Sequence, residues 1–496
     1  MGLETSGVWV VVDMMTCNIP KMKMIGLLLI VLVGCGGGET GAVGDVLIPG
    51  EDGATFDVVT PSDSAAGDLM SEDLGMEQDL EGLDNPGPGE DLTVEDLAVE
   101  DLAVEDGGHY VLYNPNDKTT TYLIDGDGET VHQWSNLTKG GYSVYLLDNG
   151  NLLRPAQVSG ASLHGGASTG LIQEITPDGT VEWEFEYSGS TWLAHHDIEP
   201  MPNGNVLLIA WEVKSKTEAE AAGRDKADEM WVDHIVEVQP GANGGSIVWE
   251  WRAWDHLVQD EDPGADNYGV VADNPQLLDV NLGASQGGPP GGGDWLHING
   301  VSYNPDRDEI VISSHFMDEI YVIDHSTTTA EAVGHTGGTR GKGGDLLYRW
   351  GSPSNYASGA AVFDVAHCSW WVPSGIPGAG NILVFNNGSH AHASSIVEIT
   401  PPYDGDGDYV MAGAAFGPAA ATWTYSNGGS FFSEHLGGVQ RLPSGNTFIV
   451  ESTSGYFFEV DPGGSVVWSH QTSANEVARA LRYEGDHPGI KILLGN

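Results

Sequence analysis

The stretch Met201-Pro-Asn-Gly-Asn-Val-Leu-Leu208 decides the fold, because variants of it recur along the chain. In each copy a tight turn with Asn-Gly or Ser-Gly is followed by an apolar run. Asn and Gly readily take the positive φ angles that tight hairpins require. Two further copies are Leu147-Asp-Asn-Gly-Asn-Leu-Leu153 and Leu442-Pro-Ser-Gly-Asn-Thr-Phe-Ile449. Each copy therefore predicts a β-hairpin.

The hairpins belong to a longer unit, in which a turn with Pro, Asp or Gly leads into a strand with tryptophan. Examples are Ile175-Thr-Pro-Asp-Gly179 before Trp183 and Val460-Asp-Pro-Gly-Gly464 before Trp468. A single four-stranded sheet cannot bury both faces, so the units must stack, and a closed ring leaves few free edges. Units of roughly 40–65 residues give about six blades. The sequence predicts an all-β, six-bladed β-propeller over residues 108–496, with a pair of β-sandwiches as the alternative.

The composition agrees with a fold of short strands and excludes several partners. The 496 residues include 70 Gly, 25 Pro and 15 Trp, which favours many turns and aromatic packing over long helices. The net charge of −54 excludes a nucleic-acid partner, because phosphate binding requires clustered Lys and Arg. Three cysteines, Cys17, Cys35 and Cys368, do not make a disulfide framework, and we expect Cys368 to be a small buried residue.

The N-terminal 35 residues have the pattern of an export signal. Lys21-Met-Lys23 precedes the apolar run Met24–Val33, which is too short to span a bilayer. Leu32-Val33-Gly34-Cys35 resembles a bacterial lipobox, which implies cleavage before Cys35 and acylation of its sulfur. Residues 1–35 are therefore predicted to be a signal peptide with a lipobox. The protein would be exported to the cell envelope and held there only by its lipid anchor, in the outer membrane or at the periplasmic face. The alternative is an ordinary signal with an incidental cysteine.

Residues 36–107 are predicted to be a disordered acidic linker. Between Glu39 and Asp106 there are 21 Asp and Glu and no Lys or Arg. Within this segment a five-residue unit, Glu-Asp-Leu followed by Ala-Val or Thr-Val, repeats. Like charges at this density repel one another and extend the chain. We interpret the segment as a stalk that holds a domain away from a membrane, the alternative being a solvated tail without a function.

Histidines recur just before the predicted hairpins and are the candidate chemistry. They occur in His195-His196-Asp197, in His297-Ile-Asn299, at His367 and at His435. Equivalent positions in successive blades converge at one end of the central channel of a propeller. A ring of histidines there can bind a metal, bind an anion or perform nucleophilic catalysis. A single histidine in a strand is usually a satisfied polar group, but several in phase favour a function.

Residues 108–496 resemble bacterial arylsulfate sulfotransferases. The stretches that carry the resemblance are Ala194–Leu208, Trp295–Asn299, Asp318–Ser326, Leu346–Gly351, Gly378–Gly388 and Gly438–Asn446. The resemblance implies a six-bladed propeller that moves a sulfuryl group from a phenolic sulfate ester to a phenol. It also implies that the reaction uses no nucleotide sulfate donor and proceeds through a transiently sulfated histidine. The implied partners are small phenols and aryl sulfates, and no cofactor is expected.

The same resemblance assigns residues to the reaction. His367 stands where the nucleophile of the family is expected. His297 and Asn299 match a His-x-Asn pair that would hold the sulfuryl oxygens and protonate the leaving phenol. His195 or His196 matches a histidine of the preceding blade. The sequence does not settle which of the two faces the site, although His196 lies nearer the following strand.

The sequence departs from the family at one position. After the run Glu309–Ser314 it has His315, where an arginine would clamp the sulfate in bidentate fashion. If His315 replaces that arginine it must be protonated, which predicts a rate maximum slightly below neutral pH. His315, His195 and His435 are the predicted substrate-binding residues. Arg340 and Arg349 are the next candidates for holding the anion.

Two other functions compete with sulfuryl transfer. The first is a non-catalytic propeller that acts as a surface binding module, because a fold does not imply a function. The second is hydrolysis at a metal held by the histidine ring, but the carboxylate and spacing pattern of such sites is missing. No metal is therefore expected, and Asp404-Gly-Asp-Gly-Asp408 is interpreted as a turn, since it lacks the spacing of a calcium loop. The long irregular stretch Asp255–Asp294 is a candidate lid.

Overall fold

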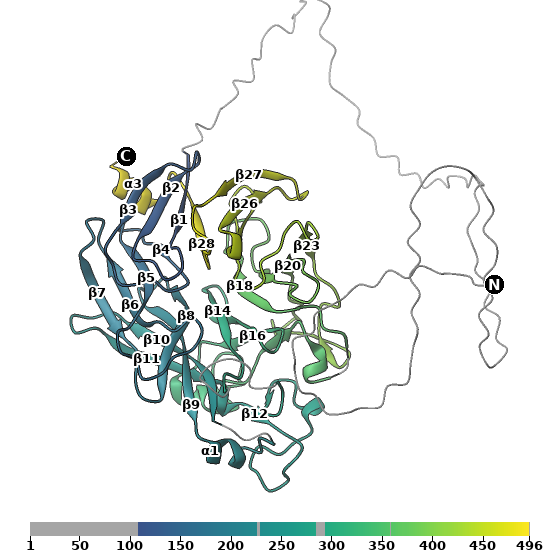
Figure 1. Cartoon of the computed structure of the whole chain (residues 1–496). Coiled ribbons are helices and arrows are strands. Elements are labelled where there is room, and N and C mark those ends of the chain that lie inside the picture. The colour runs from purple at the N-terminus through teal and green to yellow at the C-terminus, as the bar shows by residue number, and fades with distance from the viewer. Residues whose placement is uncertain (1–107, 226–228, 284–292, 358, 496) are drawn as a thin grey trace, which may run out of the picture. The chain divides into compact units, whose positions relative to one another are not determined.

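The structure is a computed structural model that describes residues 108–225, 229–283, 293–357 and 359–495. In this part of the chain, six four-stranded antiparallel sheets form the blades of a propeller (Figure 1). The predicted all-β, six-bladed propeller is therefore confirmed, and the alternative of two β-sandwiches is wrong. The predicted signal, lipobox cysteine and acidic linker lie outside the described residues and stay predictions.

Each blade runs from an innermost strand to an outermost one. The first three blades are β28 (Ala480–Glu484), β1 (His109–Tyr113), β2 (Thr121–Asp125) and β3 (Thr130–Trp134); β4 (Tyr145–Leu146), β5 (Leu152–Gln157), β6 (Gly170–Ile175) and β7 (Val181–Glu186); and β8 (Trp192–Pro200), β9 (Val206–Lys214), β10 (Met230–Gln239) and β11 (Ser246–Arg252). The last three are β14 (Ile298–Asn304), β15 (Glu309–Ser314), β16 (Glu319–Asp324) and β17 (Tyr348–Trp350); β18 (Ala366–Trp371), β19 (Ile382–Asn386), β20 (Ser395–Ile399) and β23 (Trp423–Ser426); and β24 (Gly438–Arg441), β25 (Thr447–Glu451), β26 (Tyr456–Val460) and β27 (Val466–Gln471).

The smaller elements lie between or beside the blades. The helices are α1 (Lys216–Ala221), α2 (Thr329–Ala332) and α3 (Pro488–Leu494), and the 3₁₀ turns are η1 (Ala253–Asp255), η2 (Val271–Asp273), η3 (Pro353–Asn355) and η4 (Ser452–Ser454). Two small sheets pair β12 (Leu257–Val258) with β13 (Leu278–Asp279) and β21 (Met411–Ala412) with β22 (Ala415–Phe416). Among the described residues no helix is long and apolar enough to cross a membrane.

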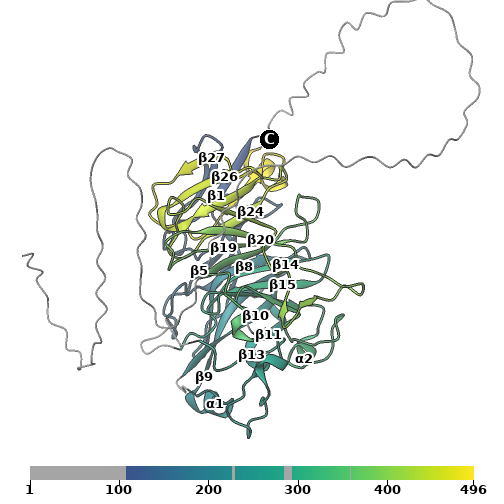
Figure 2. The same ribbon diagram turned by 90° about the vertical axis from the view of Figure 1, so that its right-hand side faces the viewer.

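The ring is closed by strands from opposite ends of the domain. Strand β28 pairs antiparallel with β1, with Leu112 opposite Leu481 and Tyr110 opposite Tyr483. The innermost strands β8, β14, β18, β24 and β28 contact one another in succession, and Figure 2 shows β8 and β14 side by side. This closure covers the sheet edge that an open stack of blades would expose.

Tryptophans on the outer strands explain why the repeat carries Trp in phase. The indole N–H of each donates to the turn of the next blade: Trp134 to Thr176 O (2.9 Å), Trp183 to Gly244 O (2.5 Å), Trp350 to Pro418 O (2.8 Å) and Trp468 to Gly126 O (2.7 Å). The large ring fills the space between two sheets, while its polar edge satisfies a carbonyl that would otherwise be unpaired. Each such tryptophan therefore joins one blade to the next.

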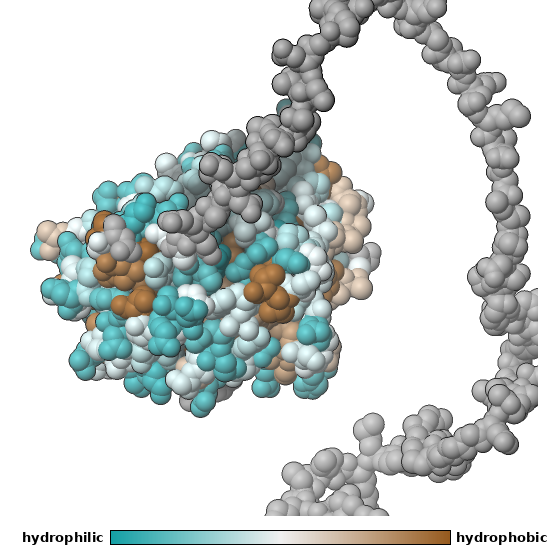
Figure 3. All heavy atoms as spheres, turned by 90° about the horizontal axis from the view of Figure 1, so that it is seen from above, coloured by the Kyte–Doolittle hydropathy of each residue, from teal (hydrophilic) through white to brown (hydrophobic). Residues whose placement is uncertain are grey.

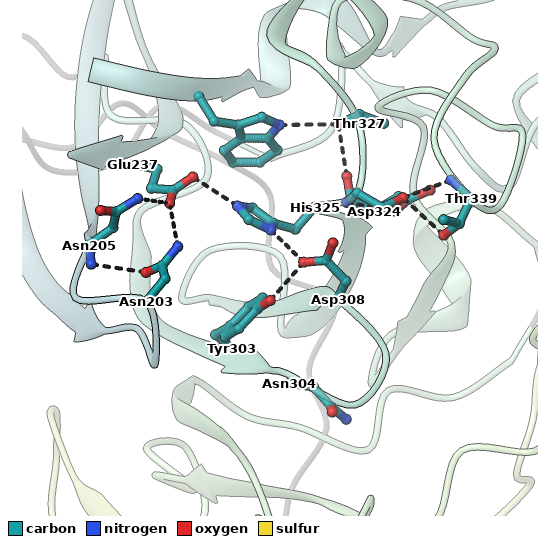
Figure 4. A network of polar contacts seen from close by, with 12 residues as sticks. Asn203, Asn205, Glu237, Tyr303, Asn304, Asp308, Asp324, His325, Thr327 and Thr339 are labelled. Atoms are coloured by element: carbon teal, nitrogen blue, oxygen red, sulfur yellow. Dashed lines mark hydrogen bonds and ion pairs between the residues drawn. The ribbon is translucent and has the colours of Figure 1, made fainter. Parts of the chain in front are cut away.

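An ion network adds a further link between the third and fourth blades (Figure 4). His325, which follows β16, places Nδ1 2.6 Å from Asp308 Oδ1 and Nε2 3.1 Å from Glu237 Oε2. Burial lowers the pKa of His325, but hydrogen bonds to the two carboxylates and their charges raise it, with a net value of about 9. His325 is therefore an imidazolium at neutral pH and holds a carboxylate of β10 against the hairpin after β14.

We expect the substitution His325→Gln to lower the free energy of unfolding at pH 6 by about 2–3 kcal/mol. The pKa of His325 is raised on folding from 6.5 to about 9. Its contribution is therefore complete below pH 6.5 and is lost as the pH rises through about 9. Urea unfolding of wild type and variant at pH 6, 7.5 and 10 checks this. A difference that does not shrink at pH 10 would contradict the ionic link.

The surface agrees with the strongly acidic composition. The face shown in Figure 3 is largely hydrophilic, with separate hydrophobic patches on it. A body of this charge gives an anionic substrate no long-range attraction, so an anion would have to be held by groups inside a pocket.

Candidate active site

A small cavity at the centre of the propeller is lined by residues from all six blades. Six of them, one from each blade, are called the ring below: Tyr142, His196, Asn299, His367, Gly437 and Arg479. Their chain neighbours Asp197, Cys368, Leu436 and Ala478 complete the lining. Each ring residue lies in, or just before, the innermost strand of its blade. The cavity measures about 20 Å³, which is room for a water-sized group. All six blades therefore meet around the axis at this level, and five of the six ring residues bring a polar side chain, Gly437 being the exception.

The spacing in the sequence explains the ring. His196 and His367 each stand five residues before the residue that opens the hairpin turn, Met201 and Val372 respectively. Asn299 stands at the same distance from Asn304. His297 and His435 stand two residues earlier in their blades. The histidines are therefore not all equivalent, and only His196 and His367 share the ring position.

Backbone bulges help to turn these side chains toward the axis. The register of β8 against β9 shifts between His195 and Ile198, and that of β18 against β19 shifts between His367 and Trp370. His196 and Cys368 have φ angles of 54° and 48°, in the left-handed region that non-glycine residues rarely adopt. Bulges of this kind redirect side chains and are common beside functional sites.

His367 is held in one tautomer. Its Nδ1 lies 2.6 Å from Asn387 Oδ1, while the amide nitrogen of Asn387 donates to the carbonyls of Ser433 and Leu436. The two carbonyls orient the amide, so its oxygen faces the ring and His367 Nδ1 carries the hydrogen. Burial and the neighbouring His315 hold the pKa of His367 well below its usual range. Its Nε2 is therefore a free lone pair on a neutral imidazole.

His297 has the opposite charge state. Its Nδ1 lies 2.5 Å from Asp294 Oδ2, and Asp294 also accepts a hydrogen bond from Trp211 Nε1. Burial lowers the pKa of His297, but the charge and hydrogen bond of Asp294 and the charge of Asp233 raise it above its ordinary value. Because Nδ1 is held by the carboxylate, Nε2 carries the proton that His297 can give away.

His196, rather than His195, faces the cavity. His195 lies behind it, with the two Nδ1 atoms 2.7 Å apart and the ring of His195 stacked on Trp211 at 3.8 Å. Burial, followed by the charge of His297, lowers the pKa of His196 well below its usual range. The pKa of His195 is likewise lowered by burial. His195 therefore positions His196, and both rings are neutral near pH 7.

His315 lies between the protonated His297 and the neutral His367, and it is itself neutral. Its ring centroid lies 5.1 Å from that of His297 and 5.2 Å from that of His367. Burial, and then the charges of His297 and His435, lower its pKa to about 3. His315 is therefore neutral near pH 7 in the ligand-free protein, and its role in binding the sulfate, with the pH optimum derived from it, stays a prediction. Burial, which the sequence does not display, is the reason for the low pKa.

The remaining predicted residues differ in their placement. Asn299 lines the cavity, donating to Ala366 O (2.8 Å) and accepting from Ser313 Oγ (2.7 Å), so its amide is oriented. His435 does not line the cavity. Its side chain is 48% exposed and lies 3.6 Å from Glu476.

The sequence analysis did not identify Arg479, the positively charged residue of the ring. Arg479 lines the cavity, and its guanidinium lies 2.9 Å from Asp197 Oδ2 and 3.0 Å from Cys368 Sγ. Burial lowers the pKa of Arg479, but the neighbouring acidic groups, Asp197 first among them, raise it well above its usual value, so the group stays charged. Cys368 is buried, as predicted. The signal was available in the register, because Arg479 stands just before the innermost strand β28, as Gly437 stands before β24.

The two arginines named from the sequence lie elsewhere. Arg340 lies 3.0 Å from Glu309, and Arg349 forms a buried ion pair with Glu319. Neither lines the central cavity. Both are committed to carboxylates of the fourth blade.

Two further sequence interpretations can be placed. The described part of Asp255–Asp294, the candidate lid, does not line the cavity, but its last residue is the carboxylate that holds His297. Asp404 Oδ1 accepts the backbone N–H groups of Asp406 and Asp408 at 2.9 and 3.0 Å. This stretch is therefore a turn stabilised by its own aspartate, as predicted.

The fold and the cavity define the class: a six-bladed β-propeller whose central site combines neutral histidines, a protonated histidine and a buried arginine. The family model described as Arylsulfotransferase (ASST) matches residues 93–488, and the chain belongs to this family. No curated protein matches the sequence.

Solved structures match the chain with low identity. A protein of unknown function from Bacteroides caccae is 13% identical, with a TM-score of 0.40, over 76% of this chain and 98% of its own. A putative 6-phosphogluconolactonase from Bacteroides fragilis is 11% identical, with a TM-score of 0.39, over 77% of this chain and 100% of its own. The β-propeller domain of Cps50 (Swd1) from Myceliophteria thermophila is 9% identical, with a TM-score of 0.35, over 75% and 89%. No functional conclusion follows from these likenesses.

Proposed function

We propose that the protein is an arylsulfate sulfotransferase that moves a sulfuryl group from a phenolic sulfate ester to a phenol through a sulfated His367. The observation that carries the proposal is the pair His367 and His297, whose pKa values are displaced in opposite directions. His297 does not line the cavity itself, but the ring of His315 lies between the two, 5.1 Å from His297 and 5.2 Å from His367. Titratable groups driven apart in this way are typical of a nucleophile and an acid that act together.

In the first step, Nε2 of His367 attacks the sulfur and the bond from sulfur to the phenolic oxygen breaks. The leaving oxygen takes the proton from His297 Nε2 and departs as the phenol. The sulfated imidazole of His367 then carries a positive charge, and its Nδ1–H donates to Asn387 Oδ1. A neutral ring is needed for the attack, which is the state that burial imposes on His367.

In the second step, the acceptor phenol gives its proton to His297, now neutral, and its oxygen attacks the sulfur. The nitrogen–sulfur bond breaks, and His367 returns to its starting tautomer with His297 protonated again. Charge develops on the sulfuryl oxygens in both steps, so donors must be oriented in advance. We assign this task to Asn299, His196 and Arg479, which line the same cavity.

The proposal predicts release of 4-nitrophenol from 4-nitrophenyl sulfate that depends on added phenol. Substitution of His297 by Gln keeps the hydrogen-bonding side chain but removes the acid, and should lower the rate at least about 100-fold. His390→Ala is the control, because His390 is exposed and does not line the cavity. Release that is absent, or that is equally fast without phenol, would contradict a sulfotransferase.

A non-catalytic binding module is the second candidate. The observation that favours it is the neutral His315 at the place where a fixed positive charge was expected. Such a module would bind 4-nitrophenyl sulfate in calorimetry with neither turnover nor a covalent adduct.

A further inference from the structure

A second group of histidines converges away from the central ring. His256 Nδ1 lies 2.9 Å from Asp345 Oδ1, and His335 Nδ1 lies 2.7 Å from the same oxygen. The three ligand atoms lie within 4.8 Å of one another. His256 follows η1, whereas His335 and Asp345 lie in the segment between α2 and β17, so the fold brings the set together. None of the three residues lines the central cavity.

The two hydrogen-bond contacts of the His256 ring leave a place for a proton or a metal ion between Nδ1 and Asp345. Its Nε2 lies 2.8 Å from the carbonyl oxygen of Ala332, which only accepts, so Nε2 carries a hydrogen. A neutral imidazole then has a lone pair on Nδ1, and this lone pair faces a carboxylate oxygen that is also an acceptor. Either a second proton or a metal ion must lie between them. A metal bound there would be shared with His335 Nδ1, which faces the same oxygen.

The ring of His256 is fixed by its surroundings. It is fully buried and lies parallel to Trp251, at an interplanar angle of 2°. The hydrogen bond from Nε2 to a carbonyl is the contact that orients metal-binding histidines and sets their tautomer. The contact of Nε2 therefore fixes the orientation of the His256 ring, with Nδ1 directed toward the proposed ion.

The setting favours a cation. His335 is 60% exposed and lines a cleft of about 580 Å³. Glu218, Asp255 and Asp266 line the same cleft, and the described lining residues include no Lys or Arg. The acidic walls would concentrate cations, and the exposed His335 gives them access.

We propose that His256, His335 and Asp345 bind a divalent transition-metal ion such as Zn²⁺, with a further coordination position open to the cleft. Two imidazole nitrogens and one carboxylate oxygen suit zinc, which leaves one position of a tetrahedron for water or a ligand. Ligand distances of about 2.0–2.1 Å require the nitrogen and oxygen atoms to move apart only slightly from hydrogen-bond distance. The ion would tie the segment after α2 to the end of the third blade. This site is independent of the sulfuryl-transfer proposal.

The test is a titration of the full-length protein with Co²⁺, which replaces Zn²⁺ and absorbs visible light when its coordination is tetrahedral. We expect a saturable absorption band at one equivalent that added Zn²⁺ abolishes. His335→Ala should weaken Co²⁺ binding at least about tenfold, and the substituted side chain is exposed, so folding should persist. Asp345→Asn should weaken it similarly.

The matched control is His390→Ala. His390 is also exposed, and its Nδ1 lies 2.6 Å from Asp364 Oδ1. Among the described residues, however, this pair belongs to no group of three side chains that could hold a metal ion. This variant should bind Co²⁺ like the wild type. The absence of a saturable band, or equal affinity in the wild type and His335→Ala, would overturn the proposal. Sulfotransferase activity is measured in parallel, and its presence or absence leaves the conclusion about the metal unchanged.

Discussion

Replacement of His367 by alanine is expected to lower kcat for phenol-dependent release of 4-nitrophenol by about 10³-fold or more. The substitution removes the neutral Nε2 lone pair that, in the proposed mechanism, forms the covalent bond to sulfur. Wild-type protein treated with donor alone should carry one added sulfuryl mass on the peptide containing His367. The variant should carry none.

Two observations separate loss of the nucleophile from loss of the fold. The truncation leaves Asn387 Oδ1 without its donor, at a cost of about 1–3 kcal/mol, so urea unfolding must show that the variant is still folded. An adduct found on His196 would move the nucleophile to the other neutral histidine of the ring. Full activity of a folded His367→Ala variant would sink the sulfohistidine mechanism.

The second large effect concerns Arg479. Substitution by Met should lower the free energy of unfolding by about 3–5 kcal/mol, because it leaves the buried carboxylate of Asp197 without its partner. Burial raises the pKa of Asp197, and the charge of Arg479 lowers it. Without Arg479 the pKa should rise further, so the variant should lose least stability at low pH, where Asp197 is protonated.

The double substitution Arg479→Met with Asp197→Asn distinguishes the fold from the chemistry. It removes the uncompensated charge and keeps an acceptor for one of the two backbone N–H groups, of Ile198 and Val301, that Asp197 binds through its two oxygens, so stability should recover in part. If Arg479 also holds the sulfuryl group, the recovered protein should show a raised KM for the donor. Equal stability of the Arg479→Met variant and the wild type would show that the ion pair contributes nothing.

The fold was predictable because the residues that determine it act over short distances in the sequence. The turn after Met201 and the tryptophan Trp183 each act within one hairpin or between adjacent blades. The pairing of β28 with β1 was less visible, because the two strands come from opposite ends of the domain and no turn joins them.

The candidate site was predictable only where it shares the hairpin spacing. Tyr142 and Arg479 occupy the ring position, but neither is a histidine, and neither was singled out. Asn387 and Asp294, which set the charge states of His367 and His297, act through contacts that a motif does not reveal. The low pKa of His315 in the ligand-free protein could not be read from the sequence either, since only the folded protein buries this side chain.

The closure of the ring determines at what point during synthesis the chain can complete its propeller and its proposed active site. Arg479 and β28 follow all the other ring residues and blade strands in the sequence, so they emerge from the ribosome after the rest of the propeller. A nascent or prematurely terminated chain that ends before residue 479 lacks both. Such a chain has an open sheet edge at β1 and no arginine in its cavity, so incomplete copies should be inactive and exposed to proteolysis.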